Sequence, residues 1–211
     1  MKKLDKRKHK ATLGISVVVP CAYSHVPHLA GLLQVLLAQS RKPDQIIFAT
    51  SGCKVSELPP LDAQFVHSAE RRTAGANRNR GANAALGEVV IYQDADDVPH
   101  PQRVEIVAAL FEKYDIDHLM HFYDRGTAPP QELTIKQAAK HTGYHKHLVG
   151  GVTHGNPAVA RACVGAVRWP EYSQIGEDLE YNTRVYEHTK RTAVTELPLL
   201  TYRQHLSSFG E

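Results

Sequence analysis

Short apolar runs alternate with helix-compatible segments through the first half of this chain. Four runs indicate strands, at residues 15–19, 45–49, 64–67 and 88–92. The first run is apolar on both faces, which is typical of a parallel strand covered by helices on either side. Three segments have a composition or an apolar spacing that favours helices: residues 28–39, 73–86 and 103–114. This alternation predicts an α/β fold with a mostly parallel central sheet flanked by helices.

The second half of the chain is less regular. We expect a strand at residues 118–123, a helix at 176–188, and two short strands at 192–196 and 199–204. Sequence repeats with a period of about 20–50 residues are absent, which excludes a solenoid. Gly87 follows the helical segment at 73–86 and is expected to cap it.

The length and composition are those of a single folded domain. The chain has 211 residues, of which 42% are apolar and 22% charged, so wholesale disorder is excluded. The longest apolar stretch, residues 29–38, is shorter than the roughly 20 residues of a membrane span. We also expect no secretory signal, because no apolar stretch of signal type follows the basic start. The three cysteines, Cys21, Cys53 and Cys163, have no metal-type spacing, which favours a reducing, cytoplasmic location.

The net charge of +3 is unevenly distributed. Residues 2–10 contain six Lys or Arg and one Asp, and the rest of the chain is slightly negative. We therefore expect residues 1–13 to form a basic, flexible arm and residues 14–211 to form one domain. A nucleic-acid binder more often carries its basic residues on the folded surface, so no nucleic-acid partner is expected. The alternative role for residues 1–10 is weak contact with an anionic lipid surface.

Three carboxylates follow the run at 88–92, in the sequence Asp94-Ala95-Asp96-Asp97. Ligands of open parallel sheets bind beyond the carboxyl ends of the strands. Carboxylates placed there suit Mn²⁺ or Mg²⁺ together with phosphate oxygens. The spacing alone is weak evidence, because Asp115-Ile116-Asp117 repeats it. The simpler interpretation is that Asp96 or Asp97 caps the next helix.

Two further segments carry candidate chemistry. Asn77-Arg78-Asn79-Arg80-Gly81 offers guanidinium groups that match phosphate geometry, although these arginines would face water on an ordinary amphipathic helix. Gly176-Glu177-Asp178 begins the helix expected at 176–188. Its carboxylates are favoured there by the helix dipole, or one of them acts as a general base. Trp169 is either a core residue or a face on which a sugar ring stacks.

The chain has thirteen histidines, four of which cluster: His141, His145, His147 and His154. The segment lacks the Glu partner of a metalloprotease motif, which favours solvent-facing or substrate-loop histidines over a zinc site. His205, in Tyr202-Arg203-Gln204-His205, lies near the end of the chain, where a lone histidine is most often a surface residue.

In order and spacing, these motifs resemble the family-2 glycosyltransferases over roughly residues 14–206. The segments that carry the resemblance are 15–20 for the first strand, 77–81 and 86–97 for the central signature, 176–178 for the Glu-Asp turn, and 202–205 for the closing Tyr-Arg-x-His. The resemblance implies a single Rossmann-like domain of the GT-A type. Its nucleotide-binding half would cover about residues 14–115, and its acceptor-binding half about residues 116–211.

The resemblance also implies a reaction and its site. The donor would be a nucleotide sugar, with a UDP-sugar most expected, and the acceptor a hydroxyl of a glycan, lipid or protein. Asp178, beside Glu177, would deprotonate the acceptor, and the anomeric carbon would be inverted. Asp96, with Asp94, Asp97 and His205, would hold Mn²⁺ or Mg²⁺ as the family's DxD motif does. The nucleotide would contact Pro20, Tyr23, Thr50, Ser51, Arg78, Asp94, Ala95 and Asp96.

The chain departs from the family pattern in two places. Pro20-Cys21-Ala22-Tyr23-Ser24 stands where the family often has Pro-x-Tyr-Asn, and Thr50-Ser51 stands where it usually has an Asp pair that reads the base. A hydroxyl binds a base more weakly than a carboxylate does, so a catalytically weak nucleotide-sugar-binding domain is one alternative. A nucleotidyltransferase is the other, although residues 21–28 lack the Gly and Lys or Arg of its usual loop.

Overall fold

The computed structural model describes residues 2–7, 12–126, 131–145, 151–172 and 176–203. In the first half, strands and helices alternate as predicted. The strands are β1 (Ile15–Ala22), β2 (Gln45–Ser51), β3 (Gln64–Ser68) and β4 (Val89–Tyr92). The helices are α1 (Leu29–Leu37) and α2 (Ala74–Ala84), with short 3-10 turns η1 (Tyr23–His28) and η2 (Val55–Glu57). The four strands pair in parallel, in the order β3-β2-β1-β4.

The second half adds five strands and four helices to the described structure. The strands are β5 (Val98–Pro99), β6 (His118–Asp124), β7 (Thr142–Tyr144), β8 (Ala158–Ala160) and β9 (Thr192–Thr201). The helices are α3 (Arg103–Lys113), α4 (Ile135–Lys140), α5 (Arg161–Ala166) and α6 (Glu177–Thr189). β8 pairs antiparallel with both β4 and β6, and so joins the two halves. Within the described ranges this gives one nine-stranded sheet, whose longer pairings are parallel.

The prediction of two strands at 192–196 and 199–204 is wrong, because β9 is continuous. Pro198 lies inside it and has no backbone N–H to donate, which is why the sequence suggested a break. The pairing of β9 with β6 shifts register beside Pro198, opposite Phe122. An irregularity in the ladder therefore accommodates the proline.

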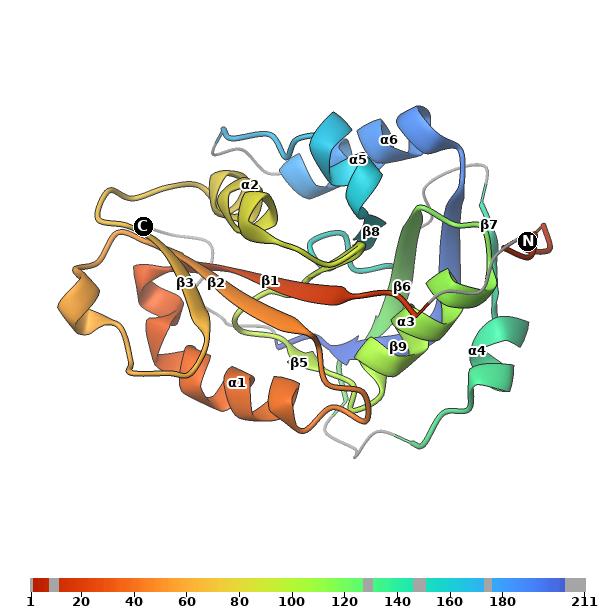
Figure 1. Cartoon of the computed structure of the whole chain (residues 1–211), viewed down its shortest axis with the longest axis horizontal. Coiled ribbons are helices and arrows are strands. Elements are labelled where there is room, and N and C mark those ends of the chain that lie inside the picture. Colours follow the sequence, from red (N-terminus) through yellow and green to blue (C-terminus); the bar gives the residue numbers. More distant parts are fainter. Residues whose placement is uncertain (1, 8–11, 127–130, 146–150, 173–175, 204–211) are drawn as a thin grey trace.

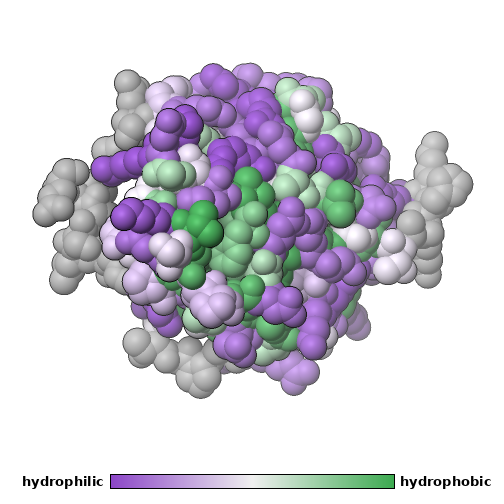
Figure 2. Space-filling model, turned by 60° about the vertical axis from the view of Figure 1, so that its left-hand side comes forward, coloured by the Kyte–Doolittle hydropathy of each residue, from purple (hydrophilic) through white to green (hydrophobic). Residues whose placement is uncertain are grey.

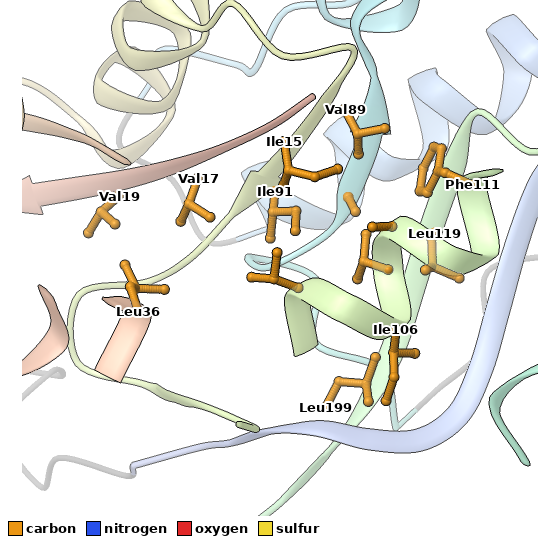
Figure 3. Close-up of a cluster of buried hydrophobic side chains, with 14 of the residues drawn as sticks. Ile15, Val17, Val19, Leu36, Val89, Ile91, Ile106, Phe111, Leu119 and Leu199 are labelled. Carbon is orange, nitrogen blue, oxygen red and sulfur yellow. The ribbon is translucent and has the colours of Figure 1, made fainter. Parts of the chain in front are cut away.

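The core lies on both faces of the sheet. On one face, side chains of β1 and β4 such as Val17, Val19 and Ile91 pack against α1 and α3 (Figure 3). On the other face, Val18 and Val90 belong to a buried cluster shared with residues of α2, α5 and α6. These three helices form the layer on that side of the sheet (Figure 1). Successive residues of β1 thus belong to opposite layers, as the doubly apolar run predicts. The expectation of an α/β sheet flanked by helices is confirmed.

Part of the basic N-terminal segment packs on the domain. Leu4 is buried, and the backbones of Lys2 and Lys6 form bridges with Tyr144 and Tyr114. Residues 2–7 are therefore not the solvated arm that their charge suggests, because one apolar side chain among the lysines reaches the core. None of the helices in the described ranges combines the length and apolar character that a membrane crossing requires.

Two glycines of the central signature are required by close packing. A Cβ on Gly81 would lie 2.5 Å from Val18 Cγ1, so α2 approaches β1 closely only because this side chain is absent. A Cβ on Gly87 would lie 2.7 Å from Gly14 O and from Ser16 N. The prediction that Gly87 caps α2 is wrong, since the C-cap is Ala85 with extended backbone. Gly87 instead allows the chain to pass beside the start of β1.

Candidate active site

The carboxyl ends of β1 and β4 meet the start of α2 at one edge of the sheet. A cavity of about 240 Å³ opens there, and its walls include Pro20, Arg78 and Asp96. A second cavity, of about 330 Å³, lies between α1 and residues 95–99. Ala95 and Asp96 line both cavities. Figure 2 brings this side of the molecule forward and shows hydrophobic residues gathered in the centre of the face within a hydrophilic rim.

The acidic loop, residues 94–97, holds its three carboxylates in different ways. Asp94 accepts hydrogen bonds from Arg78 Nη2 at 2.7 Å and from Asn156 Nδ2 at 3.1 Å. Asp97 accepts one from Asn156 Nδ2 at 3.1 Å and one from the Arg203 backbone N–H at 3.2 Å. Asp96 accepts no hydrogen bond from any residue that the structure describes, and His25 Nε2 lies 4.0 Å from it. Asp96 is therefore the carboxylate left free for a ligand.

The alternative in which Asp96 or Asp97 caps the next helix is wrong. The helix α3 begins at Arg103, and Gln102 occupies its cap position without a side-chain hydrogen bond. The short strand β5 lies between the acidic loop and this helix. The carboxylates are thus separated from the helix terminus and face the cavities instead.

Asn156 is a buried residue of the site that no sequence pattern indicated. Its Nδ2 group donates to Asp94 and Asp97, and its Oδ1 accepts the Asp94 backbone N–H at 2.7 Å. It comes from the loop before β8, more than fifty positions from the acidic loop in sequence. A single asparagine after a glycine is common in loops, so no pattern distinguishes it.

Arg103 is a second hidden residue, a fully buried cation beneath the acidic loop. Its Nη2 donates to Tyr92 O and Asn156 O, and its Nε donates to His121 Nε2 at 3.1 Å. Burial lowers the pKa of Arg103 to about 10, so it stays protonated at neutral pH. His121 accepts this hydrogen bond through Nε2, and burial and the Arg103 charge lower the pKa of His121 to about 3. It is therefore a neutral imidazole.

The carboxylates raise one another's proton affinity. Burial, and after it the charges of Asp94 and Asp96, raises the pKa of the Asp97 carboxyl to about 7. Burial also raises the pKa of Asp94, against the opposing charge of Arg78. Like charges in a partly buried loop repel one another, which disfavours ionisation of all three carboxylates. A bound cation would offset this repulsion.

Arg78 and Trp169 form the floor between the acidic loop and α6. Arg78 is 4% exposed, and its guanidinium lies 4.4 Å from the Trp169 ring centroid. Burial tends to lower the pKa of Arg78, but the charge and hydrogen bond of Asp94 together with the charges of Glu177 and Asp178 outweigh it, and the pKa is raised. Trp169 is 2% exposed and stacks on Tyr181 at 3.8 Å. Trp169 is thus a core residue and not a sugar platform, and Arg78 does not face water as an amphipathic helix would place it.

The first turn of α6 supplies the second set of carboxylates. The turn follows Gly176, whose φ of 101° is readily adopted only by glycine. Glu177 Oε1 lies 3.7 Å from Arg78 Nη1, so this side chain faces the same arginine as Asp94 does. Asp178 Oδ1 accepts the Leu179 backbone N–H at 2.7 Å. Arg78 therefore connects the acidic loop to the turn that carries Asp178.

The residues expected to read the base are engaged within the protein. Thr50 Oγ1 lies 3.0 Å from His67 Nδ1, and Ser51 Oγ accepts a hydrogen bond from Asn77 Nδ2 at 2.8 Å. Both are buried. Asn77 lines the smaller cavity, whereas Thr50 and Ser51 are not among its lining residues. Tyr23 is 55% exposed, in η1.

The histidine cluster does not assemble as a metal site in the described chain. His141 Nδ1 lies 3.7 Å from Glu196, while His154 belongs to the loop before β8. Among the residues that the structure places, no three His, Cys, Asp or Glu side chains are grouped to hold a metal ion. His147 and His205 lie outside the described residues. The three cysteines are buried and free.

Comparison with known proteins supports the reading of these motifs. An uncharacterised glycosyltransferase of Nostoc sp. is 29% identical over 134 residues, which are 59% of this chain and 40% of that protein. EpsH of Bacillus subtilis, a candidate glycosyltransferase, is 26% identical over 217 residues, which are 93% of this chain and 62% of that protein. The chain thus spans less than two thirds of either relative.

Solved structures with the same fold are glycosyltransferases of the GT-A type. Staphylococcus aureus TarS, residues 1–349 in complex with UDP, aligns with a TM-score of 0.68 at 18% identity, covering 90% of this chain and 60% of that one. Glucosyl-3-phosphoglycerate synthase of Mycobacterium tuberculosis, with Mn²⁺, UDP and phosphoglyceric acid, aligns at 0.62 and 17%, covering 96% and 79%. The profile of Glycosyl transferase family 2 matches residues 16–162, which is more than half of the chain. The chain therefore belongs to glycosyltransferase family 2.

Proposed function

We propose that this chain is the catalytic part of an inverting glycosyltransferase that transfers a sugar from a UDP-sugar to an acceptor hydroxyl. The observation that carries this proposal is the pairing of Arg78 with both Asp94 and Glu177. Through this pairing, the acidic loop, which suits a metal-bound nucleotide diphosphate, lies next to the first turn of α6. That turn carries Asp178, whose carboxylate is available to a substrate. The TarS complexes with UDP and UDP-GlcNAc and the synthase complex with UDP support UDP as the nucleotide.

The acidic loop fits a divalent metal held together with phosphate. Asp96 has no hydrogen bond within the described chain, and it lines both cavities. One free carboxylate beside a cavity suits Mn²⁺ or Mg²⁺, which bind proteins through few carboxylates plus phosphate oxygens. We assign Asp96 as the direct ligand and Asp94 and Asp97 as its supporting neighbours, with His205 as a further candidate. The ion would neutralise charge on the leaving diphosphate.

The protein's own residues would perform the remaining steps. Asp178 accepts the proton of the acceptor hydroxyl, whose oxygen attacks the anomeric carbon of the donor. The bond from this carbon to the diphosphate oxygen breaks as the new bond forms, and its electron pair leaves with UDP. Because attack and departure are in line, the anomeric configuration inverts. Pro20, Tyr23, Asn77 and Ala95 would line the nucleotide, and Arg78 would keep Asp94 ionised.

Family membership favours glycosyl transfer over the nucleotidyltransferase alternative. The weak-binder alternative is kept by one observation, the internal hydrogen bonds of Thr50 and Ser51. The acceptor, as a glycan, lipid or protein, and the cytoplasmic location stay predictions. The same holds for the weak membrane contact of residues 1–10 and for the absence of a nucleic-acid partner.

A donor panel tests the proposal. The chain is incubated with UDP-glucose, UDP-GlcNAc, GDP-mannose and CMP-sialic acid, each with Mn²⁺, Mg²⁺ or EDTA, and nucleotide release is measured with water as the acceptor. We expect metal-dependent release of UDP and little release from the other donors. Metal-dependent binding of UDP without release from any UDP-sugar would favour the weak-binder alternative, and preference for another nucleotide would overturn UDP.

A further inference from the structure

Asn182 is a fully buried polar residue one helical turn beyond Asp178. Its Nδ2 group donates to the Asp178 carbonyl at 2.7 Å and to the His154 carbonyl at 2.9 Å. Its Oδ1 lies 2.9 Å from His118 Nε2. The residue is 0% exposed, and each of its polar atoms has a partner. One amide group thus ties the first turn of α6 to the loop before β8 and to β6.

The direction of these hydrogen bonds is fixed by the chemistry of the partners. Both carbonyls are acceptors, so the Asn182 amide nitrogen must face them and its oxygen must face His118. His118 Nε2 therefore carries the proton and donates to Asn182. This leaves His118 Nδ1 as an acceptor for the Thr192 hydroxyl, 3.1 Å away on β9. The network runs without a break from β9 through β6 to α6.

The loop that Asn182 holds also reaches the acidic loop. Gly155 follows His154, and a Cβ on Gly155 would overlap Asp94 Oδ2. The next residue, Asn156, donates to Asp94 and Asp97. The segment 153–156 therefore has Asp94 on one side and Asn182 on the other. Its backbone is itself anchored, because the Thr153 N–H donates to His121 O at 3.0 Å.

The other described link between the two carboxylate groups is looser. Glu177 and Arg78 approach within 3.7 Å, which exceeds a hydrogen-bond length. Asn182 Nδ2 instead donates to His154 O at 2.9 Å across the same boundary, and to Asp178 O at 2.7 Å within α6. We propose that Asn182 is a positioning residue that fixes Asp178 relative to the acidic loop. The inference rests on the proposed role of Asp178 as the base. It predicts an effect on the transfer rate and not on nucleotide affinity, because Asn182 lines neither cavity of the acidic loop.

The test compares Asn182→Ala with a matched control on the same helix. Thr183 Oγ1 donates to the carbonyl of Leu179 at 2.8 Å, four residues back, and its side chain makes no hydrogen bond to a loop residue that the structure describes. Thr183→Ala therefore removes a side-chain hydrogen bond to the carbonyl four residues back, as Asn182→Ala does, but leaves the hydrogen bond between α6 and the His154 carbonyl intact. We expect Asn182→Ala to lower the single-turnover release of UDP from UDP-GlcNAc or UDP-glucose by about 10²-fold, the scale of a 1 Å misplacement. UDP affinity with Mn²⁺ should change by less than about 2-fold, and Thr183→Ala should match the wild type in both.

Hydrogen exchange gives a readout that does not depend on activity. Amides of residues 178–182 should exchange at least about 10-fold faster in Asn182→Ala than in Thr183→Ala. If the wild type releases no UDP at all, the proposed function fails while exchange still tests the link. If Asn182→Ala does not fold, two variants of His118 replace it. His118→Gln keeps an N–H donor toward Asn182, and His118→Leu removes it. Release and exchange equal to the wild type in Asn182→Ala, or in both His118 variants, would overturn the proposal.

Discussion

The two groups of carboxylates that meet at Arg78 are held in opposite ways. In the acidic loop, Asp94 and Asp97 are each fixed by two hydrogen bonds from other parts of the chain. In the first turn of α6, Asp178 accepts one bond from the adjacent backbone, and Glu177 has a single longer ion pair. The loop that would bind the donor is therefore organised in advance, while the carboxylate that would take a proton stays accessible.

This difference suits the two tasks. A site for a diphosphate and its metal gains affinity when its carboxylates need no rearrangement. A general base instead needs an oxygen that is open to the acceptor hydroxyl. The backbone of the α6 turn is nonetheless fixed, through Asn182. The following changes test the contrast, beginning with the largest expected effect.

Asp96→Ala should lower the Mn²⁺-dependent affinity for UDP by about 100-fold or more, because it removes the free carboxylate assigned as the metal ligand. The fold should survive, since the Asp96 side chain is 27% exposed and accepts no hydrogen bond in the described chain. Titration calorimetry with and without Mn²⁺ measures the loss, and Asp62→Ala at an exposed carboxylate is the control. Unchanged UDP affinity in Asp96→Ala would place the metal elsewhere.

Arg78→Ala should destabilise the protein by about 1.5–3 kcal/mol, the range for a hydrogen bond to a charged group. Its removal leaves Asp94 without its cation in a partly buried site. The free energy of unfolding in urea checks this, with Arg71→Ala, outside the cavity, as the comparison. UDP affinity should fall as well. Equal stability of the two variants would show that the ion pair of Arg78 with Asp94 does not stabilise the folded protein.

His118 should make stability depend on pH in the acidic range. Burial lowers the pKa of His118 to about 4, despite the opposing hydrogen bond with Asn182, whereas an unfolded histidine titrates near pH 6.5. Between these values the unfolded chain binds more protons, so stability is lost as pH falls from about 6.5 to about 4. The slope contributed is at most about 1.4 kcal/mol per pH unit.

His118→Gln should flatten this part of the stability curve, measured by urea unfolding at several pH values. His121, with a pKa of about 3, contributes with the same sign in both proteins and cancels in the difference. Parallel curves for the wild type and His118→Gln would mean that His118 titrates alike when folded and unfolded.

Glu177→Gln should have the smallest effect, a loss of transfer of only a few fold. The side chain is close to Arg78, which keeps its stronger partner Asp94 in the variant. At 3.7 Å the Glu177 carboxylate makes no hydrogen bond to Arg78, so we expect the pair to contribute only about 1 kcal/mol. Steady-state release of UDP measures the change. A loss of more than about 100-fold would instead make Glu177 the base.

The sequence predicts the first half of the chain better than the second half, for a physical reason. Consecutive residues form each of the strands β1, β2 and β4 and the acidic loop. Their apolar runs and charge patterns can therefore be recognised in the sequence. The link through Asn156 and Asn182 joins single polar residues that are distant in sequence, and each one resembles an ordinary loop or helix residue. Neither could be selected before the fold brought its partners together.

Other details depended on tertiary context in the same way. Pro198 suggested a strand end, but the bulge opposite Phe122 accommodates it. The lysine-rich start suggested a solvated arm, but the single apolar residue Leu4 is buried. Thr50 and Ser51 were predicted to face a base, and their hydroxyls are instead engaged by His67 and Asn77.

The central claim is that the acidic loop binds the donor while Asp178 removes the acceptor proton. Single-turnover release of UDP from a saturating UDP-sugar with Mn²⁺, measured together with donor affinity in Asp178→Asn, tests it most directly. Glu180→Gln, at a half-buried carboxylate of the same helix that pairs with Arg184, is the control. We predict unchanged donor affinity and a rate lowered by about 10²–10⁴-fold in Asp178→Asn alone, the usual contribution of general base catalysis. A wild-type rate in Asp178→Asn would contradict the account.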